Sequence, residues 1–191
     1  MLGLGVFFTI PAVSSQQADG DPVRKMVGRM TSLGSFQAQV SISGSETGIV
    51  RGSLFYQRGK IHFSMSGGRV IAGDGRSLTV YNPASRVAGK QDTYGGGGGL
   101  GWLLNGFTSR VSGNRAHLTA DDPSRYINQV RVTWDPRTYI MRSISIQYRS
   151  GSTTTISFSR IARVKNISQS KFSWHPPAGS RTVENPLNQR N

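Results

Sequence analysis

Apolar and polar residues alternate with a period of two along most of this chain, and this pattern constrains the fold more than any other feature. Between residues 139 and 149 the large apolar side chains Ile140, Ile144 and Ile146 share one parity, and serines take the other. Because successive side chains of a strand point to opposite faces, such a segment has one covered face and one solvated face. Similar segments span 36–43, 49–57, 60–65, 69–72, 77–82, 115–120, 126–135 and 152–160. Turn signals such as Asp74-Gly75 separate them, so we expect an antiparallel meander of about ten strands.

One segment has helical spacing instead. Asp21-Pro22 is typical of a helix start, with an N-cap followed by proline at the first helical position. Gly34 is typical of a helix end, so the spacing predicts a helix over 21–33. The apolar residues at spacings of three and four are Val23, Met26, Val27, Met30 and Leu33.

The predicted sheet has more apolar surface than the predicted helices can cover. The only other helix candidate is short, LGWLLNGF at 100–107. Either the sheet closes on itself and fills with side chains, or it leaves a hollow. A concave sheet that is incompletely filled is a ready site for an apolar ligand.

The N-terminus has the pattern of an export signal. Residues 1–13, MLGLGVFFTIPAV, are apolar and are followed by small and polar residues. A bilayer span takes about 20 residues, so this run is too short to cross one. We expect a signal peptide over 1–18 and a single domain over 19–191.

Composition excludes several kinds of site. The chain has no cysteine, which rules out disulfides, thiolate metal sites and cysteine nucleophiles. Its three histidines, His62, His117 and His175, are far apart, and its few acidic residues fall mostly in turns. These features predict a non-enzymatic protein without a cofactor or metal.

The formal net charge of +14 has two interpretations. A nucleic-acid binder would concentrate its cations in a basic run or helix. Here the arginines are spread about one to each strand or turn, which favours a solvated basic surface that meets acidic partners or anionic lipid heads.

Two features suggest a lid. The run Gly95–Gly99 lacks the Lys-Ser/Thr ending of a phosphate loop and is more typical of a hinge. The apolar segment that follows it is either a lid or an ordinary buried segment. Arg58 shares the parity of Leu54 and Tyr56, so either it bonds to a covering segment or the strand has ended and its head reaches solvent.

Several motifs occur in an order that resembles the LolA family of periplasmic outer-membrane lipoprotein carriers. These are SFQA at 35–38, RGSLFYQR at 51–58, IHF at 61–63 and DGRSLTVYNP at 74–83. The ending FSWHPPAG at 172–179 is similar to the family's Phe-x-Phe-x-Pro-Pro-x-Gly close. The resemblance runs from about residue 21 to 185.

The resemblance implies a mainly β fold, a curved and incompletely closed antiparallel barrel with a helical lid and an apolar cavity. It implies a soluble, monomeric periplasmic carrier of acylated lipoproteins, which it receives from an inner-membrane ABC-type releasing complex and passes to an outer-membrane acceptor. Arg58 matches the family arginine that locks the lid, and Ile61 matches a residue that contacts cargo and partner. The expected lipid-binding residues are Leu54, Tyr56, Ile61, Phe63, Leu78, Val80, Leu100, Trp102, Leu103, Val132, Trp134, Ile144, Ile146 and Phe158. The alternatives are a lipid-sensing or envelope-stress regulator with the same fold, and a basic nucleic-acid-binding β domain.

Overall fold

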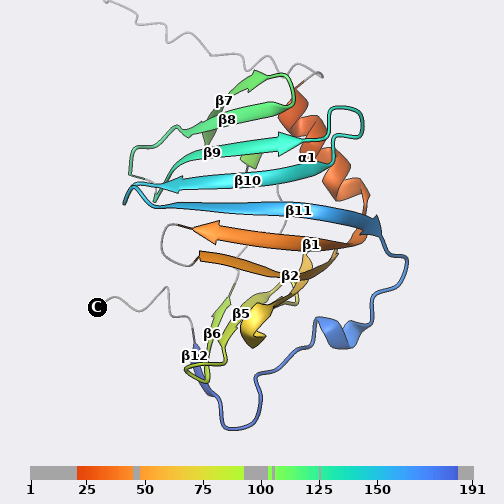
Figure 1. The fold of residues 1–191 in the computed structure, drawn as a ribbon, viewed down its shortest axis with the longest axis vertical. Helices are drawn as coiled ribbons and strands as arrows, with labels where there is room; N and C mark the ends of the chain where they lie inside the picture. The colour runs from red at the N-terminus through yellow and green to blue at the C-terminus, as the bar shows by residue number, and fades with distance from the viewer. Residues whose placement is uncertain (1–20, 45–47, 93–102, 105, 125, 185–191) are drawn as a thin grey trace, which may run out of the picture.

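A computed structural model describes residues 21–44, 48–92, 103–104, 106–124 and 126–184. The predicted signal peptide therefore lies outside the described residues. One helix, α1 (Pro22–Ser32), precedes twelve strands (Figure 1). The strands are β1 (Ser35–Gly44), β2 (Gly48–Gln57), β3 (Lys60–Met65), β4 (Val70–Gly73), β5 (Ser77–Asn82), β6 (Val87–Asp92), β7 (Phe107–Ser112), β8 (Arg115–Ala120), β9 (Ile127–Trp134), β10 (Met141–Tyr148), β11 (Thr153–Arg163) and β12 (Arg181–Glu184). Two short 3-10 turns lie at Ser66–Gly68 and Gln169–Lys171.

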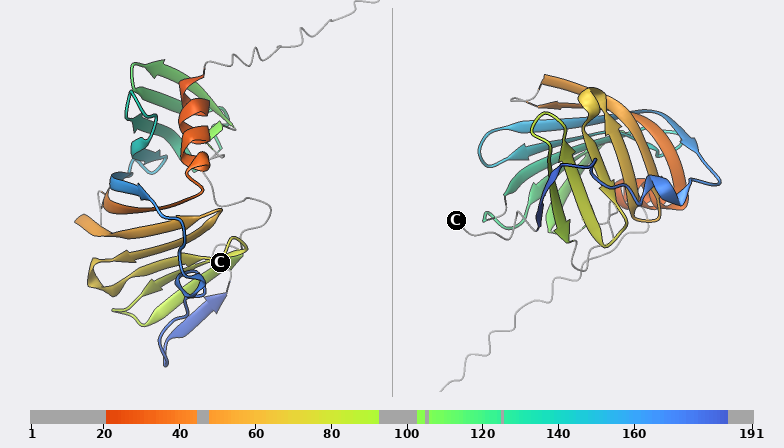
Figure 2. Two further views of the ribbon diagram at one scale, coloured as in Figure 1. Left: turned by 90° about the vertical axis from the view of Figure 1, so that its right-hand side faces the viewer. Right: turned by 90° about the horizontal axis from the view of Figure 1, so that it is seen from below.

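All twelve strands belong to one sheet in the order β12-β6-β5-β4-β3-β2-β1-β11-β10-β9-β8-β7. Neighbours are antiparallel except β12, which runs parallel to β6. The sheet is strongly curved but not closed into a barrel (Figure 2). The predicted mainly β, incompletely closed architecture is confirmed, with 57% of the described residues in strands.

The structure contains three strands that the sequence does not predict, β6, β7 and β12. Two of them, β7 and β12, form the two edges of the sheet, and β6 lies next to β12. All three are short and largely polar, as in VAGKQD and RTVE, so none shows the clear alternation of a half-buried strand. Phe107, placed in a helix candidate from the sequence, instead begins β7.

The predicted helix is confirmed to within one residue at each end. The Asp21 carboxylate accepts a hydrogen bond from the backbone N–H of Val23 at 2.9 Å, which caps the first turn. Gly34 ends the helix with a φ of +68°, a left-handed conformation that glycine adopts without a Cβ penalty.

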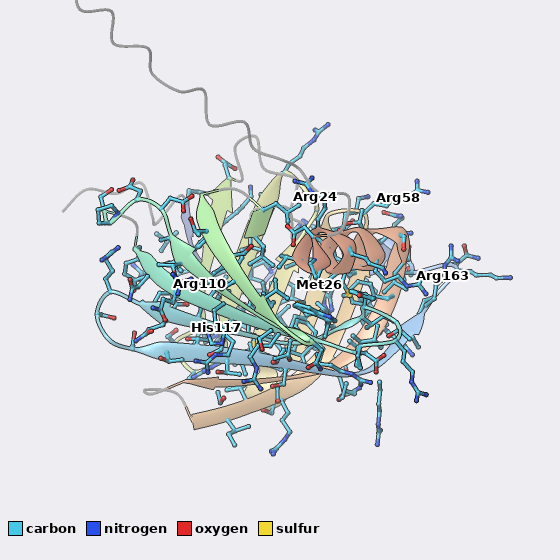
Figure 3. The ribbon with its side chains drawn as sticks, turned by 90° about the horizontal axis from the view of Figure 1, so that it is seen from above. Arg24, Met26, Arg58, Arg110, His117 and Arg163 are labelled. Carbon is cyan, nitrogen blue, oxygen red and sulfur yellow. The ribbon has the colours of Figure 1, made fainter. Side chains whose placement is uncertain are left out.

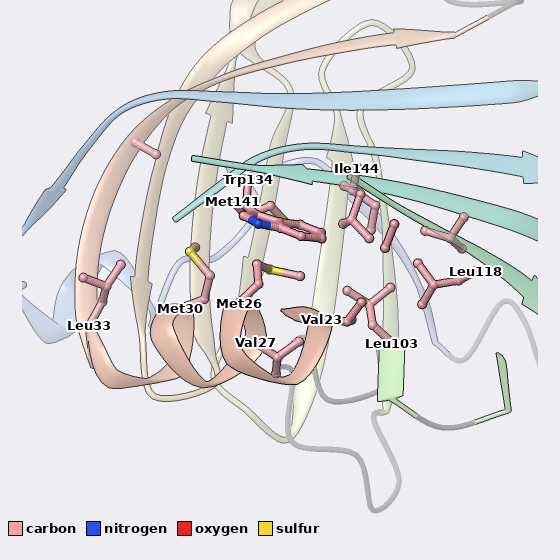
Figure 4. Packing of buried hydrophobic residues seen from close by; sticks show 14 of the residues in the cluster. Val23, Met26, Val27, Met30, Leu33, Leu103, Leu118, Trp134, Met141 and Ile144 are labelled. Carbon is pink, nitrogen blue, oxygen red and sulfur yellow. The ribbon is translucent and has the colours of Figure 1, made fainter. Parts of the chain in front are cut away.

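The hydrophobic core lies between α1 and strands β8, β9 and β10. Met26 and Met30 project from the helix toward Trp134 and Met141 (Figure 4). Met26 and Trp134 are 0% and 1% exposed. The apolar stripe of α1 is therefore a core feature, and its methionines fill the space under the sheet.

A bulge changes the predicted faces of β10. The pairing of β10 with β9 shifts between Met141 and Ser143, so Met141 opposes Trp134 and is buried. Ile140 precedes the strand and packs against the core as expected, and the bulge adds Met141 to the covered face. The bulge turns Arg142 outward, where its guanidinium donates to the Asp135 carboxylate at 2.9 Å.

The segment from 164 to 180 runs across the convex face of the sheet. Phe172 is buried there, and the Trp174 ring lies 5.5 Å from the ring of Tyr81. Lys171 Nζ sits 4.8 Å from the Phe55 ring centre. No helix in the described part of the chain is long and apolar enough to cross a membrane.

Gly52 lies on the concave face at a point where no side chain fits. A Cβ built there would overlap the Ser64 carbonyl oxygen and would lie 2.8 Å from the Phe63 ring. We expect Gly52→Ala to destabilise the protein by about 1–3 kcal/mol, because overpacking forces strands β2 and β3 apart. Chemical denaturation measures this change.

Gly28 supplies the matched control. It lies in α1, and a Cβ there meets nothing within 4 Å. Gly28→Ala should stabilise the protein by about 0.5–1 kcal/mol, since alanine loses less entropy in a helix. Equal effects of the two substitutions would contradict the close approach at Gly52.

Candidate functional site

The strand register gathers the predicted lipid-binding side chains on one face of the sheet. From β1 outward, Phe36 opposes Tyr56, Tyr56 opposes Ile61, and Leu54 opposes Phe63. Residues directly opposite each other in a ladder share a face. This face is concave, and α1 partly covers it. By the same rule, it also carries these other predicted lipid-binding residues: Leu78, Val80, Val132, Trp134, Ile144, Ile146 and Phe158.

Burial along this face changes from one half of the sheet to the other. Val132, Trp134 and Ile144 are fully buried against α1 and belong to the packed core. Val80 is 46% exposed. Figure 2 shows α1 alongside the β7–β10 half of the sheet and away from β5, β6 and β12. Among the described residues, the less buried part of this face is therefore the half formed by β2 to β5.

We call this half the open concave patch. It is apolar, and none of its members is charged. Its rings include Tyr56, which stacks on Phe36 with centroids 5.1 Å apart. A surface of this kind can bind hydrocarbon. Its members are Leu54, Tyr56, Ile61, Met65, Ile71, Leu78 and Val80.

Ile71 and Met65 are absent from the set that the sequence predicts for ligand binding. Met65 continues the alternation of Ile61 and Phe63, so the sequence pattern could have placed it on this face. Ile71 lies on β4, which has only four residues, too few for parity to be read. Its pairing with Phe63 and with Val80 places it in the centre of the patch.

The predicted lid is only partly visible. Leu100 and Trp102 lie outside the described residues, as does the run Gly95–Gly99. Leu103 is 1% exposed and packs near Val23 in the core (Figure 4). The roles predicted for Leu100, Trp102 and Leu103 in ligand binding stay predictions.

Arg58 lies in the turn between β2 and β3, because β2 ends at Gln57. It has a φ of +45°, and its backbone N–H donates to the Gly34 carbonyl at 3.1 Å, where α1 joins β1. Its side chain is exposed (Figure 3), and among the described residues its guanidinium has no hydrogen-bond or ionic partner. Its predicted role as the lid lock stays a prediction.

Charged groups surround the core rather than enter the patch. Figure 3 shows Arg24 on the side of α1 opposite Met26. On the convex face, burial and the nearby Lys171 hold the pKa of His62 below its usual value. No cluster of three or more His, Asp or Glu residues suited to a metal occurs within the described ranges.

Asp135 organises the turn that follows β9. Its carboxylate accepts hydrogen bonds from the Arg142 guanidinium, from the backbone N–H of Arg137 at 3.1 Å and from that of Thr138 at 3.0 Å. The Arg142 bond, followed by those from Thr138, holds the pKa of Asp135 well below its usual range. The turn thereby holds Tyr139, whose ring stacks on Trp134.

The sequence matches no family model and no curated protein. Solved structures share the fold. An uncharacterized conserved protein from Thermus thermophilus is 9% identical with a TM-score of 0.57, and the match covers 86% of this chain and 99% of that one. MucB, in the Pseudomonas aeruginosa MucA/MucB complex, is 12% identical with a TM-score of 0.51, and the match covers 85% of this chain and 64% of MucB. A LolA superfamily protein from Nitrosomonas europaea is 11% identical with a TM-score of 0.42, covering 78% and 96%. The first two likenesses establish a shared fold, and likeness at this level of identity shows the fold alone.

Replacing Asp135 tests the turn beneath Trp134. A carboxylate whose pKa is lowered by folding stabilises the protein above its unfolded pKa of about 4, and that stability is lost as the pH falls toward the folded value. Asp135→Asn should lower the melting temperature at pH 7 and flatten its decline between about pH 5 and pH 2. Thermal melts followed by circular dichroism measure both effects.

Arg142→Gln should reproduce part of that change, since Arg142 makes the largest contribution to the shift. An identical acid dependence in the wild type and in Asp135→Asn would refute this role.

Proposed function

We propose that this chain is a soluble, non-enzymatic carrier of the periplasm that shields the acyl chains of lipoproteins. In this proposal it acts as a monomer, receives cargo from an inner-membrane ABC-type releasing complex and delivers it to an outer-membrane acceptor. The proposal combines the motif order of the sequence with the chemistry of the open concave patch.

The exposure of apolar side chains on the concave face is the observation that carries the proposal. Val80 is nearly half exposed, and Leu54, Tyr56, Ile61, Ile71 and Leu78 are half-buried around it. Exposed apolar residues grouped on a concave surface are typical of a binding site. Each methylene of an acyl chain that this surface removes from water would contribute about 0.8 kcal/mol.

A second candidate is a regulator of the envelope that senses lipid through the same surface. The likeness to MucB favours it, because that protein is seen in complex with MucA. This chain covers only 64% of MucB, so it would correspond to part of such a protein. Transfer of a bound acylated peptide to acceptor vesicles separates the two, since a carrier delivers its cargo and a sensor keeps it.

Charge on the patch tests whether it binds acyl chains. Val80→Asp should weaken binding of a fluorescent palmitoyl probe at least about tenfold, because a carboxylate loses hydration when hydrocarbon covers it. Fluorescence titration measures the dissociation constant.

Ile49→Asp is the matched control. Ile49 is 62% exposed and pairs with Ser43 on the convex parity of β2. Its substitution should leave probe affinity within about twofold, a change of less than about 0.5 kcal/mol. Equal losses at both positions would show that the probe does not occupy the patch.

Arg58→Leu tests the lid lock. We expect a folded protein that still binds an acylated peptide but transfers it to acceptor vesicles about tenfold more slowly. A charge-assisted hydrogen bond to the lid is worth about 1.5–3 kcal/mol, and its loss removes the force that returns the lid to its closed state.

Arg160→Leu controls for backbone conformation. Arg160 is also exposed and has a φ of +51°, close to the +45° of Arg58. Its variant should transfer cargo at the wild-type rate. Normal transfer by Arg58→Leu would remove the lock from the mechanism.

A further inference from the structure

A basic groove lies between α1 and the turn that joins β9 to β10. It has a volume of about 470 Å³. Lys25, Arg29 and Ser32 line it from the helix, and Arg137 and Tyr139 line it from the turn. These helix residues are exposed and alternate with the buried stripe, so the groove lies outside the core.

The groove carries three cations, and no acidic residue lines it. Asp135, in the same turn, is the acid that could neutralise them. Its carboxylate instead bonds to Arg142 at 2.9 Å and to backbone and hydroxyl donors of its own turn. The positive charge of Lys25, Arg29 and Arg137 therefore faces an open space.

The walls of the groove are held in place. The Tyr139 N–H donates to the Asp135 carbonyl at 2.8 Å, and the Asp135 N–H donates to the Ile140 carbonyl at 2.8 Å. The ammonium group of Lys25 sits 4.1 Å from the centre of the Tyr139 ring, which connects the helix to the turn. Gly28 adds no side chain between them, and a Cβ there would meet open space. The backbone of the turn and the Lys25 side chain are therefore positioned before a ligand binds.

We propose that this groove binds a phosphate-bearing group. Two guanidinium groups from opposite walls can each present a planar pair of donors, the geometry that suits the several oxygens of a phosphate. Three positive charges match a phosphate ester better than a single carboxylate. The volume suits a group of headgroup size. This inference does not depend on acyl-chain binding by the open concave patch.

The source of the phosphate is either a soluble ester or the headgroup of an anionic lipid, and two probes distinguish them. Glycerol phosphate is titrated into the nitrogen-15-labelled full chain, and the amide signals of Gly28 and Tyr139 are followed. Vesicles of phosphatidylcholine, with and without phosphatidylglycerol, are then tested for binding by sedimentation at a fixed salt concentration, because charge attraction is screened by salt.

The test variant is the double substitution Arg29→Gln and Arg137→Gln. The control is Arg110→Gln with Arg131→Gln. Those two arginines are exposed on the convex face, in one cross-strand row with His117. Both variants lower the net charge equally. We expect the groove variant to weaken binding of at least one probe by on the order of tenfold or more, and the control by less than about threefold.

Loss of glycerol phosphate binding in the groove variant alone supports the site with a soluble ester as a ligand. Loss of binding to phosphatidylglycerol vesicles in the groove variant, but not in the control variant, supports the site with a lipid headgroup as the ligand. Equal weakening in the two double variants overturns the proposal, because it would show diffuse attraction to the whole basic surface. Absence of any binding that depends on the groove arginines also overturns it. Palmitoyl-probe affinity should stay unchanged in the groove variant, so failure here leaves the carrier proposal to its own tests.

Discussion

The structure depends on how one helix covers a curved sheet of twelve strands. The buried stripe of α1 fills the space under β8, β9 and β10, where Met26 meets Trp134. An eleven-residue helix is about 16 Å long, which is too short to cover the whole concave face. The irregular segment from 164 to 180 does not make up the difference, because it packs on the convex side against Tyr81 and Phe55. The half-buried side chains of β2 to β5 follow from this arrangement.

The two faces of the sheet differ in chemistry as well as in curvature. Cross-strand rows on the convex face contain hydroxyl and guanidinium groups, as in the row from Arg115 through Thr133, Ser143, Ser157 and Ser41. The concave face contains aliphatic and aromatic groups. The guanidinium groups of these rows therefore lie on the convex face, away from the open concave patch. The proposed phosphate site beside α1 and the proposed hydrocarbon site inside the sheet therefore lie on separate surfaces.

The sequence predicted what local periodicity determines. The stripe from Val23 to Leu33 and the alternation in β2, β3 and β9 placed most of the patch and the core on the correct face. The edge strands β7 and β12 were not predictable in this way, because edge strands need little apolar alternation. The bulge at Arg142 depends on pairing with β9 and on the Asp135 carboxylate, which no local pattern reveals. Arg58 illustrates the same limit, since parity alone could not show that β2 stops one residue earlier.

The centre of the sheet has a consequence for how the chain acquires its structure. Strand β1 pairs with β11, more than a hundred residues later, and this pairing joins the two halves of the sheet. Contacts of such long sequence separation form slowly, because loop-closure entropy is lost before they stabilise the chain. The helix cannot bury its stripe until β8 to β10 have been made. A nascent chain can pair β2 to β6 locally, but it cannot close the centre of the sheet or complete the core under α1 until nearly all of it has been synthesised.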